Sequence, residues 1–393
     1  MKCKENYCKN KMQDLSVYIH WPFCKSKCPY CDFMSVPEHD LDKYREIEDF
    51  LLLDLKNSLN ELDNPVIKTL FFGGGTPSLM SVKSLERIID FITKNYKIDQ
   101  DIEISLEANP ATFSYQKLNE IKRAGVNRLS LGIQSFSDKN LKFLGRIYDS
   151  QQALKAADMV ATSFSNYSFD FIYGYQKQSI KDLEYDLNMA IKFHCPHLSY
   201  YQLTFEKNTL FFNLLKKGDI SKISEDQEIE TFNYINDFLR KYSFSRYEIS
   251  NYSLQNFESK HNLVYWRYQN YLGVGPSAHS RLVFDDKKYE LRKFSDINKW
   301  KSRLHENSST YEVRKSLTEF EQLEEIFIMG LRLSEGISLK RLRSEFSDFL
   351  LQPIFKKINS ISDSDVFEKS QTHIKLSYNG LIKQNSVIEF LFD

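Results

Sequence analysis

Residues 17–33 read Val-Tyr-Ile-His-Trp-Pro-Phe-Cys-Lys-Ser-Lys-Cys-Pro-Tyr-Cys-Asp-Phe, and they place Cys24, Cys28 and Cys31 directly after a short apolar strand. Spacings of four and three residues allow three thiolates to converge on one inorganic centre, and soft thiolates select Fe–S clusters, zinc or Cu(I). A fourth local cysteine is missing. An Fe–S cube held by three thiolates keeps one iron open for another ligand, whereas structural zinc is normally closed by four protein ligands.

Other interpretations of the cysteines stay open when the triplet is taken alone. A zinc site of three cysteines and one histidine needs only His20 or His39 as its fourth ligand. A disulfide is a weaker alternative, because no signal peptide precedes the cysteines and a cytosolic chain keeps its thiols reduced. The rest of the sequence has to decide between these sites.

The composition indicates a cytoplasmic protein without a polyanionic partner. The 393 residues suffice for one large α/β domain and a smaller one. Lys+Arg and Asp+Glu are both 53, so the formal net charge is zero and we expect no nucleic-acid partner. The sequence has neither a run of 18 apolar residues nor the apolar stretch of a signal peptide.

Strands and amphipathic helices alternate through the first half of the chain. We expect the strands at residues 15–20, 66–72, 101–107, 127–133, 169–173 and 198–203. Such alternation requires right-handed parallel crossovers, with helices outside a parallel sheet. Six units are too few for an eightfold barrel, so the sequence predicts an α/β fold with an open, partial (β/α)6 barrel.

Polar and glycine residues lie at or just beyond the carboxyl ends of several of these predicted strands. They are Gly73–Gly75, Glu107, Gln134 and Asp170, and the cysteine loop follows the first strand. Ligands of such folds gather at the carboxyl ends of the strands, so the shared location predicts a single site. The glycines would let backbone groups approach a polar ligand closely, although glycines of an ordinary tight turn are the alternative.

The regular alternation of predicted strands and helices ends at about residue 205. An amphipathic helix comes first, then an aromatic-rich, glycine-containing stretch from 261 to 279, and then a helix at residues 317–333. We therefore predict a flexible segment at residues 1–14, a core at 15–240 and a smaller α+β domain at 241–393.

The motifs resemble the radical S-adenosylmethionine (SAM) superfamily. The cysteine triplet, with Tyr30 before its last cysteine, and residues 73–77 after the second strand are similar to the signature of that superfamily. Residues 18–23, 105–110, 132–136 and 170–174 resemble its coproporphyrinogen-oxidase-like branch. The resemblance implies a [4Fe-4S] cluster that binds SAM through its open iron, and reductive cleavage of the sulfonium to methionine and a 5′-deoxyadenosyl radical.

The same resemblance implies which residues hold the cluster and SAM. Cys24, Cys28 and Cys31 would be the cluster ligands. The residues implied around SAM are Tyr18, Tyr30, Gly74, Gly75, Thr76, Glu107, Gln134, Arg146 and Asp170. A carboxylate can accept hydrogen bonds from ribose hydroxyls or an ammonium group, and an arginine can pair with a carboxylate. For each residue alone, a capping or surface polar role is the alternative.

Two groups within this branch differ after the triplet. The oxygen-independent coproporphyrinogen III oxidases have a further cysteine, whereas Cys31-Asp32-Phe33 resembles the HemW-type heme chaperones. Residues 261–266 match the His-Asn-x-x-Tyr motif of that group, which is associated with heme binding and here comprises His261, Asn262 and Tyr265. Imidazole is a common axial ligand of heme iron, and aromatic rings can pack on the macrocycle. A hydrogen-bonded structural histidine is the alternative for His261.

The resemblance therefore implies a heme chaperone that binds the cluster, SAM and heme, and that transfers heme to acceptor proteins. Membrane-bound respiratory enzymes would be among the acceptors, and a transient dimer and a peripheral position at the inner membrane are further implications. The alternative is a coproporphyrinogen III oxidase, since the scaffold could in principle cleave SAM reductively. Two positions depart from the family pattern: Tyr148 stands where histidine is frequent, and Gly174-Tyr175-Gln176 replaces Gly-Leu-Pro.

Overall fold

The structure is a computed structural model that describes residues 13–361, 365–368 and 370–393. Six parallel strands, neighbours in chain order, form the wall of an open barrel. They are β1 (Asp14–Trp21), β4 (Val66–Gly74), β5 (Lys97–Ala108), β6 (Arg128–Gln134), β7 (Tyr167–Tyr173) and β8 (His197–Gln202). The predicted partial (β/α)6 barrel is confirmed. The segment predicted at 1–14 lies largely outside the described residues, and Asp14 already begins β1.

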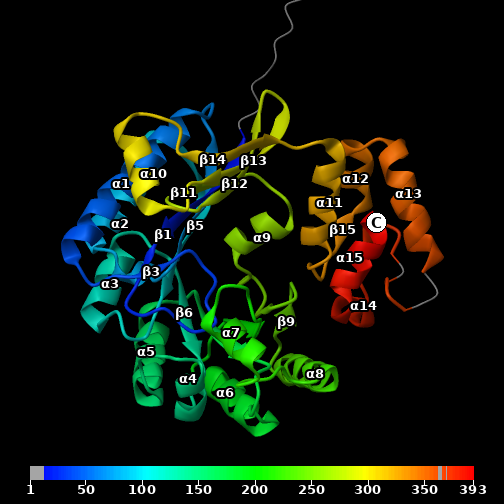
Figure 1. Ribbon diagram of the computed structural model, residues 1–393, viewed down its shortest axis with the longest axis horizontal. Coiled ribbons are helices and arrows are strands. Elements are labelled where there is room, and N and C mark those ends of the chain that lie inside the picture. Colours follow the sequence, from blue (N-terminus) through cyan, green and yellow to red (C-terminus); the bar gives the residue numbers. More distant parts are fainter. Residues whose placement is uncertain (1–12, 362–364, 369) are drawn as a thin grey trace, which may run out of the picture.

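Helices cover the outside of these strands (Figure 1). They are α1 (Leu41–Asn60), α2 (Val82–Asn95), α3 (Tyr115–Arg123), α4 (Asp138–Phe143), α5 (Ser150–Ser163) and α6 (Ile180–Lys192). Helix α2 shows why they form: Leu85, Ile88 and Ile92 recur at helical spacing and are buried, and the Ser81 side chain accepts a hydrogen bond from the backbone N–H of Ser84. Ser81 is therefore the N-cap of α2.

The sheet continues on both sides of the barrel strands. Strand β11 (Tyr271–Val274) pairs in parallel with β1, and β12 (His279–Phe284), β13 (Lys287–Lys293) and β14 (Tyr311–Ser316) add antiparallel strands. At the other edge, β10 (Asn251–Ser253) pairs with β8 and then with β9 (Ser245–Arg246). Strands on both sides of the predicted boundary at 240/241 thus belong to one sheet, and a domain division there stays a prediction.

A buried ion pair joins the first half of the chain to the added strands. Asp54 of α1 accepts a hydrogen bond of 2.8 Å from the Lys293 ammonium of β13, and both side chains are 1% exposed. Trp300, from α10 (Ile297–His305), donates its indole N–H to the same carboxylate at 3.1 Å. Because an unpaired buried charge is costly, these contacts fix β13 and α10 against α1.

The C-terminal residues form a helical unit with its own hydrophobic cluster. It contains α11 (Glu319–Gly330), β15 (Ile337–Ser338), α12 (Leu339–Glu345), α13 (Asp348–Ser360), β16 (His373–Ile374), α14 (Tyr378–Ile382) and α15 (Gln384–Phe392). The unit stands beside the barrel, and the short helix α9 (Lys260–Trp266) contacts both β4 and α11 (Figure 1). Three short elements lie between β1 and α2: β2 (Phe23–Cys24), β3 (Val36–Pro37) and the 3-10 helix η1 (Pro77–Leu79). Two further helices, α7 (Leu210–Lys217) and α8 (Glu225–Lys241), follow β8. A membrane-crossing helix, sufficiently long and apolar, is not found in the described part of the chain.

Candidate functional site

The cysteine loop starts where β1 ends. Strand β2 pairs with β3, and the backbone N–H of Cys31 donates to the carbonyl of Cys28 at 3.1 Å, which closes a tight turn. Cys24 is buried, whereas Cys28 and Cys31 are half-buried, and all three are free thiols. The disulfide alternative is therefore wrong for these cysteines. Cys3 and Cys8 lie outside the described residues.

The three thiols lie close enough to influence one another. Burial raises the pKa of Cys24 and of Cys31, and the neighbouring Cys28 raises both further. Such mutual repulsion between thiolates is relieved when all three bind one cationic centre. Among the described residues, no set of three or more His, Cys, Asp or Glu side chains is arranged so that it could hold a metal ion. Binding of a cluster by the three cysteines therefore stays a prediction.

His20 is not placed as a fourth zinc ligand. Its Nε2 lies 2.8 Å from the carbonyl oxygen of Met34, and its Nδ1 lies 3.1 Å from the Tyr18 hydroxyl. Burial lowers the pKa of His20 to about 4, so the ring is neutral at physiological pH. With both ring nitrogens engaged by other groups, His20 stabilises the base of the cysteine loop.

The glycines pack against the backbone that leads into this loop. A Cβ added at Gly75 would lie 2.5 Å from the carbonyl oxygen of Phe23, and one at Gly74 would lie 2.6 Å from that of Trp21. Gly74 also has φ +114°, a conformation that glycine adopts without strain. The backbone N–H of Gly75 donates to the Trp21 carbonyl at 2.7 Å. These glycines therefore position the cysteine loop. The sequence alone could not distinguish this structural role from direct contact with a ligand.

Two carboxylates inside the barrel lie close enough to influence each other. Glu107, at the end of β5, accepts a hydrogen bond from the backbone N–H of Gly74 at 3.1 Å. Burial, and secondarily Asp170, raise the pKa of Glu107 to about 8. Asp170 of β7 accepts hydrogen bonds from Ser130 at 2.6 Å and Ser199 at 2.8 Å, and burial raises its pKa as well. Both residues are half-buried, so each keeps surface for a ligand that carries positive charge or hydroxyl donors.

Arg128 is a residue of this interior that the sequence analysis missed. It begins β6, is 2% exposed, and lowers the pKa of both Glu107 and Asp170. Its Nε has no hydrogen-bond partner in the described structure. Buried arginines are usually paired with an anion, and Arg128 lies near two carboxylates. The interior of the barrel therefore contains charged groups of both signs. A charged residue inside the strand predicted at 127–133 was the available signal.

Arg146 connects the carboxyl end of β6 to the cysteine loop. Its guanidinium donates to Cys28 Sγ at 2.9 Å, to the Tyr30 hydroxyl at 3.2 Å and to the Tyr148 hydroxyl at 3.0 Å. Tyr148 in turn donates to the carbonyl oxygen of Gly132 at 2.7 Å. Tyr148, a departure from the family pattern, thus holds Arg146 toward the cysteines.

The remaining residues predicted at this edge lie near the same place. Thr76 is buried and precedes η1, and a hydrogen bond from its side chain lowers the pKa of Cys24. A small cavity is lined by Thr76, Cys28 and Arg146 together. Gln134 ends β6 with φ +65° and is half-buried. Tyr18, on β1, is half-buried beside His20.

His261 belongs to α9 and lies inside the barrel next to Tyr18, with 6.4 Å between the centres of the two rings. Its Nδ1 is 2.6 Å from the Thr69 hydroxyl and its Nε2 is 2.7 Å from the Tyr265 hydroxyl, while its backbone N–H donates to Glu103 at 3.1 Å. The ring is 0% exposed, stacks on Phe71 at 4.8 Å, and burial lowers its pKa to about 3.

These contacts are those of a hydrogen-bonded structural histidine, the alternative stated for His261. Binding of heme iron would first have to break one of the two ring hydrogen bonds, so ligation by His261 stays a prediction. Asn262 is half-buried, and its backbone N–H donates to the Ser259 hydroxyl at 3.3 Å. The motif therefore docks α9 on the interior of the barrel.

Comparisons with known proteins agree with this geometry. Residues 18–190 match the Radical SAM superfamily, and residues 317–382 match the HemN C-terminal domain. The protein named heme chaperone HemW of Bacillus subtilis (strain 168) is 31% identical over 376 residues, which cover 95% of this chain and 97% of that protein. The chain belongs to the HemW family of the radical SAM superfamily. A HemW protein of Escherichia coli (strain K12) is 38% identical over 286 residues, covering 70% of this chain and 72% of that protein.

Among solved structures, coproporphyrinogen III oxidase (HemN) from Escherichia coli matches with a TM-score of 0.82 and 18% identity. The match covers 97% of this chain and 90% of the oxidase. At that identity the match shows the fold, which this chain shares with the oxidase. The sequence-based assignment to the superfamily and to its HemW group is thus confirmed.

Proposed function

We propose that this chain is a heme chaperone that holds a [4Fe-4S] cluster and SAM, binds heme, and transfers heme to acceptor proteins. The observation that carries the proposal is the trio of free thiols at the carboxyl end of β1, which shares an edge with Glu107 and Asp170. The HemW family membership supports the heme part.

The donor set at the cysteine loop fits an Fe–S cluster. Cys24, Cys28 and Cys31 supply three thiols, and His20 is turned to other partners. When bound, such a cluster would offer an open iron to the amino and carboxylate groups of SAM and an electron for cleavage of its sulfonium. Arg146, fixed by Tyr148, would keep a cation beside Cys28 and balance part of the negative charge that the thiolates bring.

The polar interior fits the rest of SAM. Glu107 and Asp170 would accept hydrogen bonds from its ammonium and ribose hydroxyls, and a cation at this position would favour the ionised form of Glu107. Our proposal keeps the full set around SAM: Tyr18, Tyr30, Gly74, Gly75, Thr76, Glu107, Gln134, Arg146 and Asp170.

A test of the cluster is anaerobic reconstitution with iron and sulfide. We expect a brown, oxygen-sensitive protein with about four irons per chain. A triple variant of Cys24, Cys28 and Cys31 to serine should stay colourless. A wild-type protein that is colourless and holds zinc would contradict the proposal.

Heme binding and enzymatic activity are tested separately. Hemin titration of the wild type should give a Soret band. Unchanged hemin binding by His261→Ala would exclude His261 as a ligand of the heme iron. Thermal unfolding of the variant serves as the control that it is folded. Incubation with coproporphyrinogen III, SAM and a reductant should give no protoporphyrinogen IX, because Asp32 and Phe33 stand directly after Cys31, where the oxidases have a further cysteine nearby. Efficient formation of that product would replace the chaperone proposal by the oxidase alternative.

A further inference from the structure

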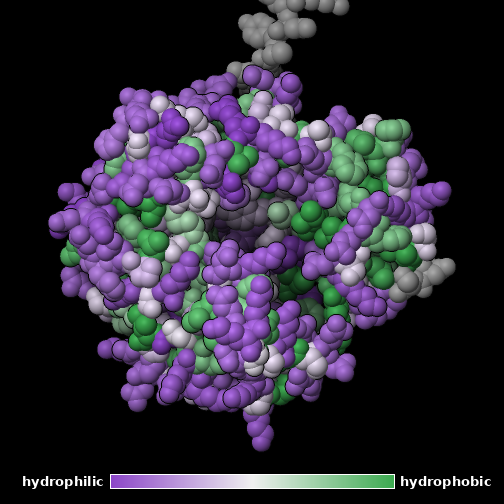
Figure 2. Space-filling view, viewed as in Figure 1, coloured by the Kyte–Doolittle hydropathy of each residue, from purple (hydrophilic) through white to green (hydrophobic). Residues whose placement is uncertain are grey.

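A large cleft lies at the end of the barrel opposite the cysteine loop. Its volume is about 1850 Å³, and residues 13–15, 63–65 and 268–270, which precede or begin β1, β4 and β11, line one wall. Residues of α11, β15 and α12 line the other wall. Ordinary small-molecule pockets measure about 300–1,000 Å³, so this space admits a larger ligand. We call it the C-terminal cleft, and Figure 2 shows the molecule hollowed between the barrel and the C-terminal helices.

The lining of the C-terminal cleft is acidic. It contains eight carboxylates and four cations, an excess of four negative charges. Each of the three arginines already forms an ion pair with a glutamate of the lining. The fourth cation, Lys288, donates to the carbonyl oxygen of Tyr268 at 3.1 Å and lies in the field of Glu325 and Glu345. The C-terminal cleft therefore repels a polyanion and favours a ligand that carries positive charge.

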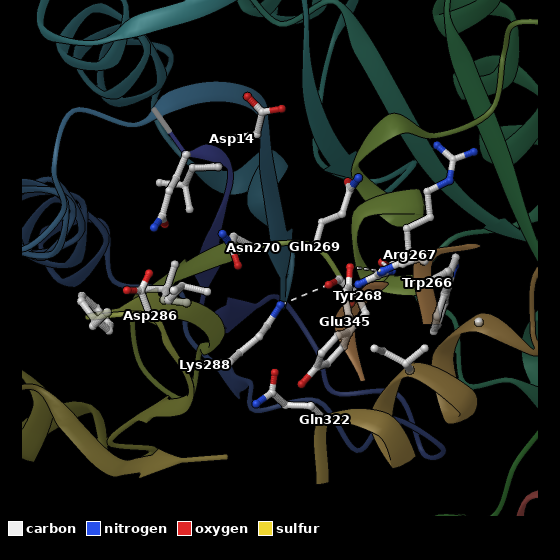
Figure 3. Close-up of a pocket in the computed structure, with 18 of the residues that line it drawn as sticks. Asp14, Trp266, Arg267, Tyr268, Gln269, Asn270, Asp286, Lys288, Gln322 and Glu345 are labelled. Carbon is white, nitrogen blue, oxygen red and sulfur yellow. Dashed lines mark hydrogen bonds and ion pairs between the residues drawn. The ribbon is translucent and has the colours of Figure 1, made fainter. Parts of the chain in front are cut away.

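Three of the carboxylates are available to such a ligand. Asp285 and Asp286 form the turn between β12 and β13, and Glu319 begins α11. All three side chains are exposed, and none forms an ion pair with a described residue. Figure 3 shows the side chains of Asp286 and Asp14 within the same cleft. A cationic ligand thus finds unpaired carboxylates on the barrel side and on the helical side of the cleft.

Strand β12 presents an unpaired edge to the C-terminal cleft. It pairs with β13 along its whole length, as far as Phe284, but with β11 only at Arg281. Among the described residues, 282–284 therefore have a neighbouring strand on one side only, and all three line the cleft. Free N–H and C=O groups at a strand edge can pair with an extended chain. The cleft thus offers backbone pairing in addition to negative charge.

The remaining lining suits long side chains. Trp266, Phe284, Ile326 and Phe346 give the cleft aromatic and aliphatic walls. The Trp266 indole N–H and the Tyr268 hydroxyl also lie in this lining, are buried, and form no hydrogen bond with a described residue. Lysine and arginine cover apolar surface with their methylene stems while their charged ends reach polar groups. The two buried groups can form further hydrogen bonds with a peptide backbone.

We propose that the C-terminal cleft is a docking site for an extended, lysine- or arginine-containing segment of a partner protein, which adds to β12 as a strand. The carboxylates bind its cationic ends, the apolar walls take its stems, and the free edge of β12 pairs with its backbone. This interaction requires neither heme nor SAM. It therefore goes beyond the function proposed above and stands or fails independently of it.

The probe is a fluorescent decapeptide of alternating lysine and valine, acetylated and amidated at its ends and titrated with the full-length protein. Its anisotropy should give a dissociation constant below about 100 μM that rises with salt, because salt screens contacts between exposed charges. The same peptide with glutamate in place of lysine should not bind. Methylation of the peptide's backbone nitrogens should weaken binding about tenfold, since it removes the donors that pair with β12.

Asp285→Asn/Asp286→Asn places the peptide on the protein. The double change removes two charges and keeps the turn, because asparagine is favoured at both positions, where φ is +48° and +60°. The affinity for the lysine peptide should fall about fivefold, and the midpoint of thermal unfolding should stay the same. Glu86→Gln/Glu230→Gln, the matched change at two exposed positions outside the cleft, should bind as the wild type does.

Four outcomes would overturn the docking site. The first is a wild type that does not bind the lysine peptide, and the second is equal binding by the wild type and Asp285→Asn/Asp286→Asn. The third is equal binding of the methylated and unmethylated peptides, which would exclude strand pairing. The fourth is tighter binding of a synthetic peptide of residues 1–12, which contains four lysines and one glutamate, because this chain itself would then supply the segment.

Discussion

Glu107 and Asp170 make the barrel interior sensitive to pH. Burial raises the pKa of Glu107 to about 8, whereas an unfolded chain would leave it near its usual value of 4.5. A carboxyl group whose pKa is raised by folding stabilises the protein fully below its unfolded pKa. That contribution is lost as the pH rises through the folded pKa. The protein without ligands should therefore lose stability between about pH 4.5 and pH 8.

Glu107→Gln tests this expectation at the level of one residue. The variant keeps an acceptor for the Gly74 N–H but cannot ionise, so its free energy of unfolding should fall less between pH 5 and pH 8. We expect the difference from the wild type to reach a few kcal/mol at pH 8, of the order that the shift in pKa implies. Urea unfolding of both proteins without cofactors, at the two pH values, measures it. Parallel pH dependences would contradict the assigned burial of Glu107.

Tyr148→Phe tests how Arg146 is held. The change removes one hydroxyl, and with it the hydrogen bonds to Arg146 and to the Gly132 carbonyl. Loss of a hydrogen bond to a charged group costs about 1.5 kcal/mol, so SAM should bind the variant roughly tenfold more weakly. Equilibrium dialysis with the cluster-loaded protein measures the affinity. Tyr115→Phe, at an exposed position, is the matched control and should bind as the wild type does.

Some residues of the site could be predicted from the local sequence pattern, and others could not. Cys28 and Glu107 could be predicted because the first follows and the second ends a predicted strand, and strand ends meet at one edge. Asp170 lies inside β7, three residues before its end. The roles of Arg128 and Tyr148 could not be predicted, since their partners come from other strands and loops. The motif at His261 was visible in the sequence, but its hydrogen bond to Thr69 joins residues 192 positions apart.

At the scale of elements, the close approach of Gly75, directly after β4, to Phe23 of β2 helps to position the cysteine loop. Gly75→Ala would place a Cβ 2.5 Å from the Phe23 carbonyl oxygen, and that oxygen belongs to backbone that cannot move without shifting Cys24. We expect the variant to reconstitute with less than half of the wild-type iron, as measured by iron and sulfide content.

Gly218→Ala serves as the control for that variant. A Cβ there meets nothing within 4 Å, although φ is +80°, so the change costs stability without touching the loop. Gly218→Ala should lower the midpoint of thermal unfolding and retain full iron content. Equal iron loss in both variants would show that stability, and not loop position, controls cluster retention.

Most elements of the barrel were predictable from periodicity. The strands expected at 66–72 and 127–133 are β4 and β6, because their apolar residues recur at strand spacing. The extension of the sheet was not predictable. Strand β11 has only four residues and pairs with β1 from more than 250 positions away. Its position depends on tertiary contacts that no local pattern records.

At the scale of the whole molecule, the Asp54–Lys293 pair links the barrel to strands that the C-terminal half adds. Lys293 donates to Asp54 at 2.8 Å and to the Thr310 hydroxyl at 2.6 Å, and neither charged group reaches solvent. Burial opposes the charged form of Lys293, but the neighbouring Asp54 raises the pKa of Lys293, so the lysine keeps its charge. The stability of the chain should therefore depend on both partners together.

Lys293→Met should lower the free energy of unfolding by about 3–5 kcal/mol, because it leaves Asp54 buried without its cation. In Asp54→Asn/Lys293→Met the buried charge is absent, while an amide oxygen can still accept from the Trp300 indole and the Gly275 N–H. The double variant should therefore be more stable than Lys293→Met alone, a coupling that urea unfolding of the two single variants and the double variant measures. Additive losses would mean that the two side chains act independently. In that case the added strands would be held by the apolar packing of Leu291 and Trp300, and the ion pair would not determine how the two halves of the chain meet.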